Sequence, residues 1–223
     1  MSSLFAVGEY STCAVVSGST YCWGAKTDSD TDFQPSPARI ELPEALIQVS
    51  VGRAHACGVS ATGAVYCWGD NETAQLGSSD PTGVGPLRVL LPARARSIAC
   101  GKQHNCAIVE DGTLWCWGSN GESQLGTAEL SLGPIVVNPT QVGIANDYVH
   151  ASCGEGHSCA LRRPGALWCW GRNTAAQLGL GTLEPGQAVT PLRVGADDDW
   201  VAISSAQEGR CGRKQMTRVP LGD

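Results

Sequence analysis

Residues 101–126 read GKQHNCAIVEDGTLWCWGSNGESQLG, and this stretch decides the fold because its three parts return elsewhere in the chain. The parts are Gly-x-x-His-x-Cys, Cys-Trp-Gly and Asn-x-x-x-Gln-Leu-Gly. The first recurs at 52–57 and 154–159, the second at 22–24, 67–69 and 169–171, and the third at 71–77 and 173–179. A pattern that returns at about every 50 residues is the signature of a repeat array.

The chain divides into four repeats and a broken fifth. A Pro-x-x-aliphatic segment closes each of the four, at 37–40, 86–89, 139–142 and 191–194. We place the repeats at about 5–48, 49–97, 98–150 and 151–202. The fifth starts in register at 203–205, but no Cys-Trp-Gly follows Cys211, so 203–223 is interpreted as a truncated repeat with a basic, irregular tail.

Each repeat reads as short strands, because apolar and β-branched residues occur in runs of four to six bounded by glycine and proline. The chain has 223 residues, of which 28 are glycines, and no apolar run is long enough for a membrane span. The fold class is therefore all-β. The net charge of -6 argues against nucleic acid as a partner, since phosphate binding needs a basic surface.

Eight of the 11 cysteines fall at positions that face each other across predicted hairpins. In the second, third and fourth repeats the two strands of the predicted hairpin are connected by three-residue loops that end in Gly63, Gly112 and Gly165. In the first repeat Ser17-Gly18 makes a two-residue loop. Opposed residues on antiparallel strands are close enough for a disulfide. The predicted pairs are Cys13 with Cys22, Cys57 with Cys67, Cys106 with Cys116, and Cys159 with Cys169.

Two alternatives to disulfides stay open, which are eight reduced core thiols and zinc binding. Zinc is disfavoured because Cys-x-x-Cys spacing is absent. Disulfides indicate an oxidising compartment, so an extracellular or cell-surface location is expected, with the cytoplasm as the alternative. The N-terminus carries no signal peptide, which predicts an upstream start or a longer exported product. Cys100, Cys153 and Cys211 are expected to be free thiols.

The ordered set of Gly-x-x-His-x-Cys, Leu-Trp-Cys-Trp-Gly, Asn-x-x-x-Gln-Leu-Gly and Pro-x-x-Val resembles the regulator of chromosome condensation repeat family. The resemblance covers residues 5 to about 202; the first repeat departs from it, with Ser11 for the histidine and no Gln-Leu-Gly. It implies a β-propeller, usually of seven four-stranded blades, and therefore an incomplete ring here, with a small closed ring of four or five blades as the alternative. The repeat positions expected to be structural are Gly52, His55, Trp68, Gly69, Gly101, His104, Trp117, Gly118, Gly154, His157, Trp170 and Gly171.

Candidate ligands and catalysts are weak in this sequence. The repeated histidines are expected to be hydrogen-bonded structural residues. The segment at 28–32 is like the start of a calcium loop, but Phe33 and Arg39 stand where glycine and glutamate are needed. No nucleophile elbow, phosphate loop or dinucleotide motif occurs, so we expect no enzyme, no metal and no cofactor.

The repeats differ most between Gln-Leu-Gly and Pro-x-x-Val, at 78–85, 127–138 and 180–190. Variable loops on a rigid scaffold usually carry recognition, so the leading hypothesis is a binding module for a protein or a glycan. The family resemblance implies an alternative, guanine nucleotide exchange on a small GTPase, and a third reading is a structural or decayed fragment. Open propeller edges also predict self-association.

Overall fold

The computed structural model describes residues 5–25, 33–80, 85–128, 133–205 and 210–214. These residues form 18 strands and no helix, in agreement with the all-β prediction. Consequently no helix in this part of the chain could cross a membrane.

Sixteen strands make four antiparallel sheets of four strands each, and in each sheet the strands pair in chain order. The first sheet comprises β1 (Phe5–Val7), β2 (Ser11–Val16), β3 (Ser19–Ala25) and β4 (Phe33–Ile40). The second comprises β5 (Leu46–Val51), β6 (His55–Ser60), β7 (Val65–Gly69) and β8 (Leu87–Val89). The third comprises β9 (Ala95–Cys100), β10 (His104–Val109), β11 (Leu114–Ser119) and β12 (Ile135–Gln141). The fourth comprises β13 (Tyr148–Cys153), β14 (His157–Arg162), β15 (Ala166–Arg172) and β16 (Gln187–Arg193).

A fifth sheet has two strands, β17 (Trp200–Ser205) and β18 (Arg210–Lys214). Within the predicted irregular tail, Arg210–Lys214 pairs with the strand before it, and residues 206–209 and 215–223 lie outside the described residues. The predicted repeat limits at 48/49, 97/98, 150/151 and 202/203 all fall inside the first strand of the following sheet.

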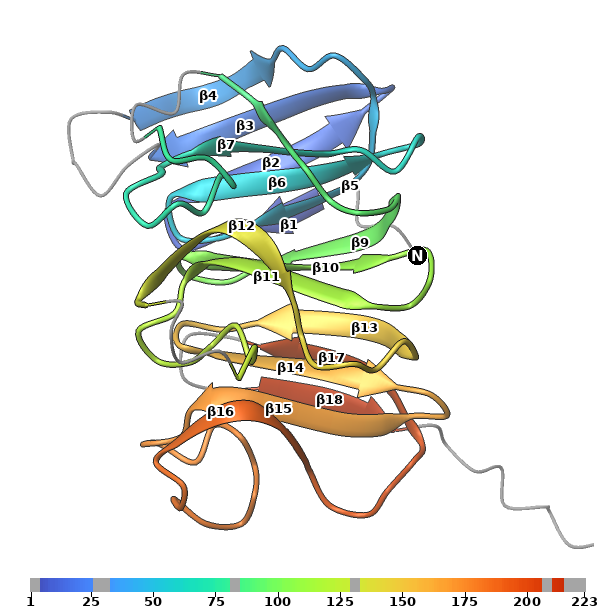
Figure 1. The fold of residues 1–223 in the computed structure, drawn as a ribbon. Coiled ribbons are helices and arrows are strands. Elements are labelled where there is room, and N and C mark those ends of the chain that lie inside the picture. Colours follow the sequence, from blue (N-terminus) through green and yellow to red (C-terminus); the bar gives the residue numbers. More distant parts are fainter. Residues whose placement is uncertain (1–4, 26–32, 81–84, 129–132, 206–209, 215–223) are drawn as a thin grey trace, which may run out of the picture.

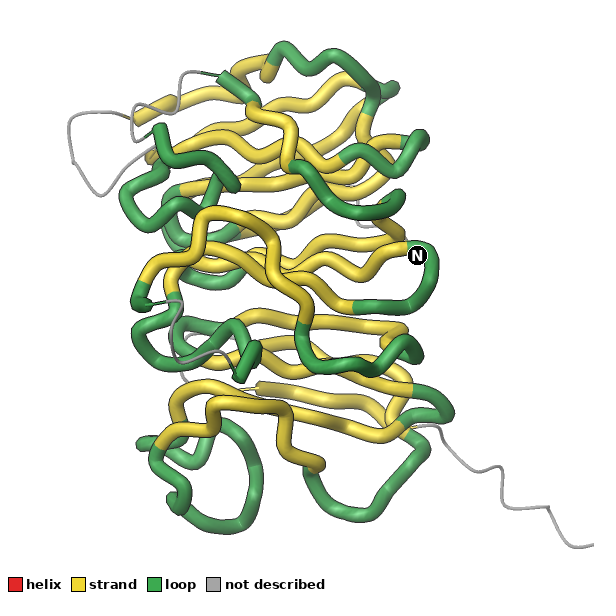
Figure 2. Tube along the Cα trace, in the orientation of Figure 1, coloured by secondary structure: helices red, strands yellow, loops and turns green. Residues whose placement is uncertain are grey.

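The sheets follow one another along the chain like the blades of a propeller (Figures 1 and 2). The first strands of neighbouring sheets are in contact: β1 with β5, β5 with β9, β9 with β13, and β13 with β17. The apolar core lies between the blades, and each of its three clusters draws residues from at least two adjacent blades. A blade thus buries its apolar faces against its neighbours, as repeat architectures do.

The register of the second and third strands brings the predicted cysteine pairs directly opposite each other. All four pairs are bonded, with Cα–Cα distances of 4.1–4.2 Å. Ser17 and Gly18 have φ of 50° and 79°, which is the two-residue hairpin turn predicted for the first repeat.

Two of the three glycines predicted to be left-handed in the longer loops have positive φ, Gly63 at 81° and Gly112 at 83°. The prediction is wrong for Gly165, which has no positive φ; its loop instead contains a cis Arg163–Pro164 bond. Glycine is required there for a different reason, since an added Cβ would lie 2.5 Å from the carbonyl oxygen of Asp198.

Candidate functional site

The repeated Gly-x-x-His segment forms the joint between one blade and the next. A Cβ added at Gly52 would lie 2.4 Å from the carbonyl oxygen of Gly101 and 2.4 Å from Cε1 of His55. At Gly101 the corresponding atoms are the Gly154 oxygen at 2.5 Å and His104 Cε1 at 2.4 Å. The glycine therefore leaves room both for the next blade and for the imidazole of its own segment.

Two of the repeated histidines make hydrogen bonds to the following blade. His55 Nε2 lies 2.8 Å from Asn105 Oδ1, and His104 Nε2 lies 2.8 Å from Ser158 Oγ. The Ser158 hydroxyl donates its proton to the Gln124 carbonyl, so His104 Nε2 must donate to Ser158. Burial lowers the pKa of His55, and burial with the neighbouring histidines lowers the pKa of His104 to about 3. Both rings are therefore neutral at physiological pH.

The Gln-Leu-Gly tail and the Cys-Trp-Gly segment join neighbouring blades as well. The Gln75 carbonyl accepts from Trp117 Nε1 at 3.0 Å and from Asn105 Nδ2 at 2.7 Å. One blade further on, the Gln124 carbonyl accepts from Trp170 Nε1 and Ser158 Oγ, both at 2.8 Å. Trp117 and Trp170 are completely buried, so they serve the joint and are not available as an external stacking platform.

One cluster within the joint has the residue types of a metal site. His55, Cys57 and Cys100 bring their ligand atoms within 4.8 Å of one another. Cys57 is bonded to Cys67, so its sulfur has no thiolate to offer a metal. Burial raises the pKa of Cys100 and of Cys153 to about 12, which makes both thiols poor ligands and poor nucleophiles. The cysteines are thus core residues in the oxidised protein.

The variable loops and the Gly-x-x-His turns lie at the same end of each sheet. His55 at the start of β6 is paired with Gly69 at the end of β7, and His104 and His157 are paired with Gly118 and Gly171 in the same way. The loop after β7 consequently leaves the sheet beside the turn before β6. We call this end of the molecule the loop face.

Repeated asparagines attach the variable loops to the scaffold. Asn71 Nδ2 donates to the carbonyls of Ser78 and Asp80, at 3.0 and 2.5 Å, while its Oδ1 accepts from the Leu76 amide. Asn173 Nδ2 likewise donates to the carbonyls of Thr182 and Pro185, at 3.0 and 3.1 Å. The loops are therefore held at their base by residues that the repeat pattern supplies.

The predicted loop limits need one correction. Ile135–Asn138 belongs to β12 and Gln187–Thr190 belongs to β16, because the outer strands begin before the repeated proline. The described loop residues are 78–80 and 85, 127–128 and 133–134, and 180–186. The calcium-like segment at 28–32 lies outside the described residues.

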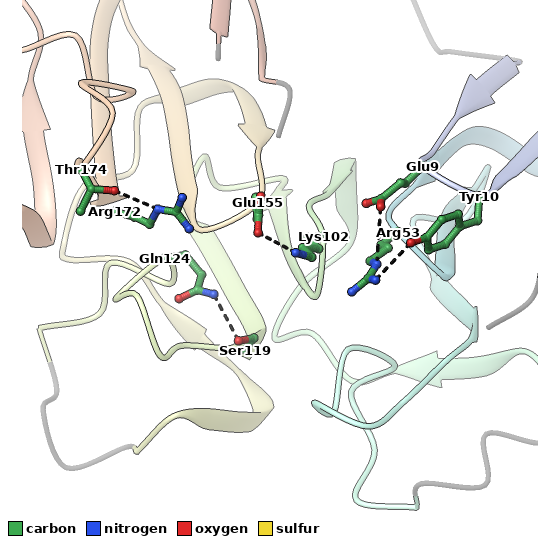
Figure 3. A network of polar contacts seen from close by, with 9 residues as sticks. All are labelled: Glu9, Tyr10, Arg53, Lys102, Ser119, Gln124, Glu155, Arg172 and Thr174. Atoms are coloured by element: carbon green, nitrogen blue, oxygen red, sulfur yellow. Dashed lines mark hydrogen bonds and ion pairs between the residues drawn. The ribbon is translucent and has the colours of Figure 1, made fainter. Parts of the chain in front are cut away.

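A charged rim, which sequence reasoning missed, lines the inner part of the loop face. It consists of Glu9, Arg53, Lys102 and Glu155, the residues that follow the glycine in each turn. Arg53 Nε lies 3.7 Å from Glu9 Oε1, and Lys102 Nζ lies 2.5 Å from Glu155 Oε1 (Figure 3). The Lys102 hydrogen bond lowers the pKa of Glu155, with further help from Arg172 and Arg53. Variation at a fixed position of the motif was the signal that could have revealed this rim.

The loop face also has a small pocket of about 230 Å³ in the third blade. The loop residues that line it are Asn120, Gly121, Ser123, Thr127, Ala128, Gly133 and Pro134, joined by Val189 of the next blade. Gln187 Nε2 donates to Ser123 Oγ at 2.8 Å and so ties the two blades together there.

Two family models with the description "Regulator of chromosome condensation (RCC1) repeat" match the chain, one at 46–75, 95–124 and 148–177 and the other at 62–108 and 111–161. Together they cover residues 46–177 without a gap. These matches include the second and third blades and most of the fourth.

Among curated proteins, the chain is similar to the human "Probable E3 ubiquitin-protein ligase HERC6", with 40% identity over 62 residues, which are 27% of this chain and 6% of that protein. Among solved structures, human WBSCR16 and Prp20p of Saccharomyces cerevisiae each superpose with a TM-score of 0.82 at 22% identity over 95% of this chain. The chain spans 57% of the WBSCR16 chain and 55% of the Prp20p chain. These structures show that the blades form an RCC1-type β-propeller fold.

Proposed function

Because this chain belongs to the regulator of chromosome condensation (RCC1) repeat family, we propose that it is a non-enzymatic module that binds a protein partner through its loop face. The observation that carries the proposal is the convergence of the variable loops and the charged rim at one end of the blades. Both kinds of surface vary between repeats, whereas the Gly-x-x-His and Gln-Leu-Gly segments behind them recur in the second, third and fourth blades.

A protein partner is favoured over a glycan by the charges of the rim. Glu9 and Glu155 flank Arg53 and Lys102, so the rim presents both signs of charge within one surface. Such a pattern is suited to a partner surface with complementary charges of both signs. The solved relative Prp20p is described by its binding to Gsp1p and histones, which is consistent with a protein-binding use of the scaffold.

The four disulfides support the further proposal that the chain works in an oxidising compartment, outside the cell or at its surface. No catalytic role is proposed for the joints, because His55 and His104 are buried with lowered pKa values and the two described thiols have raised pKa values. The loop face is therefore the site that we propose for this partner.

The test is capture of partners by the immobilised oxidised chain, with identification of what is bound. Exchanging residues 180–186 for a glycine-serine linker should remove the specific partner while the strand content stays unchanged. A rim variant that carries both Lys102→Glu and Glu155→Lys keeps the ion pair but reverses its direction, and it should weaken capture. Glu110→Lys, an exposed change at the opposite end of the blades, is the matched control.

The nucleotide-exchange alternative is tested separately by nucleotide release from a panel of small GTPases. Our proposal expects no acceleration with the oxidised or the reduced chain. Acceleration that persists after reduction would contradict a non-enzymatic, disulfide-dependent binding module. Partner capture that survives both the loop exchange and the rim variant would contradict the assignment of the loop face.

A further inference from the structure

In the second, third and fourth blades, one leucine closes the space beside the disulfide. Leu76, Leu125 and Leu178 of the Gln-Leu-Gly tails are each 0% exposed. Leu76 belongs to the core cluster that contains Cys57, Cys67 and Val89 of its own blade and Trp117 of the next. A Cβ added at the adjacent Gly77 would lie 3.2 Å from Val89 and 3.7 Å from Trp117 Nε1. The tail thus passes between its own outer strand and the tryptophan of the following blade.

The first blade has no Gln-Leu-Gly tail and no histidine of the repeat pattern. Ser11 stands at the histidine position, and the segment from 26 to 32, Lys-Thr-Asp-Ser-Asp-Thr-Asp, contains no apolar side chain. In the second blade, Ala56 occupies the position at which Asn105 and Ser158 bond to the glutamine carbonyl. The first joint therefore lacks both the hydrogen bond from a histidine and the hydrogen bond to a glutamine carbonyl that connect the later blades.

The residues that surround the buried leucine in the later blades nevertheless have counterparts at this first joint. By strand register, Cys13 and Cys22 correspond to Cys57 and Cys67, and Ile40 paired with Thr20 corresponds to Val89 paired with Val65. Trp68 corresponds to Trp117 in the Cys-Trp-Gly segment. All four counterparts, Cys13, Cys22, Ile40 and Trp68, line one largely apolar pocket of about 440 Å³ between the first two blades.

The tryptophan in this pocket differs from its counterparts in its exposure and in the hydrogen bonding of its indole N–H. Trp68 is 8% exposed, whereas Trp117 and Trp170 are 0% exposed. The indole N–H groups of Trp117 and Trp170 donate to glutamine carbonyls, but no described residue accepts a hydrogen bond from Trp68 Nε1. The pocket thus combines apolar walls with the indole N–H donor of Trp68.

We propose that this pocket binds a leucine-bearing peptide turn from another polypeptide, in the manner in which the chain's own Gln-Leu-Gly tails fill the later joints. The leucine would contact the Cys13–Cys22 disulfide and Ile40, and the carbonyl before it would accept from Trp68 Nε1. The occupant is specified by two internal precedents with both contacts, at Gln75-Leu76 and Gln124-Leu125. The site is built from strands and does not depend on the loops or the rim of the proposed function.

The probe is a fluorescently labelled, end-blocked peptide with the sequence of residues 71–77, Asn-Glu-Thr-Ala-Gln-Leu-Gly, titrated with the oxidised full chain and followed by anisotropy. We expect saturable binding, and at least a tenfold loss when aspartate replaces the leucine of the peptide. Trp68→Phe keeps the ring but removes the donor, and should weaken binding about fivefold, as expected for loss of one hydrogen bond. Trp117→Phe alters a joint that is already filled, so it is the matched control and should leave peptide affinity unchanged.

Ala56→Leu is a second variant, designed to fill the pocket and abolish binding, with circular dichroism to establish that it is folded. If it fails to fold, the comparison of Trp68→Phe with Trp117→Phe still decides the matter. Absence of saturable binding to the folded chain would overturn the proposal. Equal weakening by both tryptophan variants, or capture of a small apolar dye that the peptide does not displace, would also overturn it.

Discussion

Acidification should destabilise this protein through His104. The ring is 0% exposed and its pKa in the folded protein is about 3, against 6.5 for the unperturbed side chain. Between these two values the unfolded chain binds a proton that the folded chain does not. The stability that His104 contributes as a neutral ring is therefore complete above pH 6.5 and is lost progressively as the pH falls toward 3.

The size of the effect follows from the two pKa values. The loss in the free energy of unfolding is RT times the logarithm of a ratio, in which the proton-binding term of the ring in the unfolded chain is divided by that in the folded chain. At about pH 5 this loss is about 2 kcal/mol. The pKa of buried His55 is lowered in the same direction, so its loss adds to that of His104. Acidification acting through these two rings would thus remove a large part of the free energy of unfolding of a typical domain, which is about 5–15 kcal/mol.

The assay is equilibrium urea unfolding of the oxidised chain at about pH 7.5 and about pH 5, compared with His104→Gln. Glutamine retains an N–H donor for Ser158 but does not titrate, and carboxylates titrate in both proteins alike. The wild type should lose about 2 kcal/mol more than the variant between the two pH values. An equal loss in both proteins would refute the assignment of a buried, neutral His104.

Three further outcomes can be measured on the same material. Gly101→Ala should cost about 3 kcal/mol because its Cβ meets backbone and imidazole, whereas Gly121→Ala, with nothing within 4 Å, should be almost neutral; similar melting temperatures would contradict this. Leu125→Ala should cost about 2–5 kcal/mol in urea unfolding, since the leucine is completely buried, and a cost below 1 kcal/mol would contradict close packing of the tail. At about pH 8, Cys100 and Cys153 should resist iodoacetamide in the native oxidised protein and react after denaturation, because the pKa of each is raised to about 12; rapid native labelling would contradict their burial.

The strand order and the cysteine register could be predicted from the sequence because both are local. A hairpin loop of known length fixes which residues stand opposite each other, so Cys57 and Cys67 could be paired without any knowledge of the neighbouring blades. The failure at Gly165 has a non-local cause. Its glycine is required by the approach of Asp198 from a later segment, and sequence spacing cannot reveal that contact.

The face that carries the loops could be predicted in part, but the charged rim could not. Lys102 and Glu155 are 53 residues apart, and their ion pair exists only because successive turns stack at one end of the sheets. The pocket beside Trp68 could not be predicted from the sequence either. The missing Gln-Leu-Gly tail of the first repeat is visible in the sequence, but the space that it leaves depends on the packing of the second blade.

The joints also constrain how such a chain can change by recombination. The histidine of one blade donates a hydrogen bond to an acceptor on the blade after it, as in the pairs His55 with Asn105 and His104 with Ser158. The two partners of each pair belong to different repeats. A copied or exchanged repeat therefore brings one partner of the contact with the preceding blade and one partner of the contact with the following blade. Repeats from distinct positions are therefore not interchangeable parts, and a viable crossover would have to transfer the histidine of one repeat together with the residue after the histidine of the next.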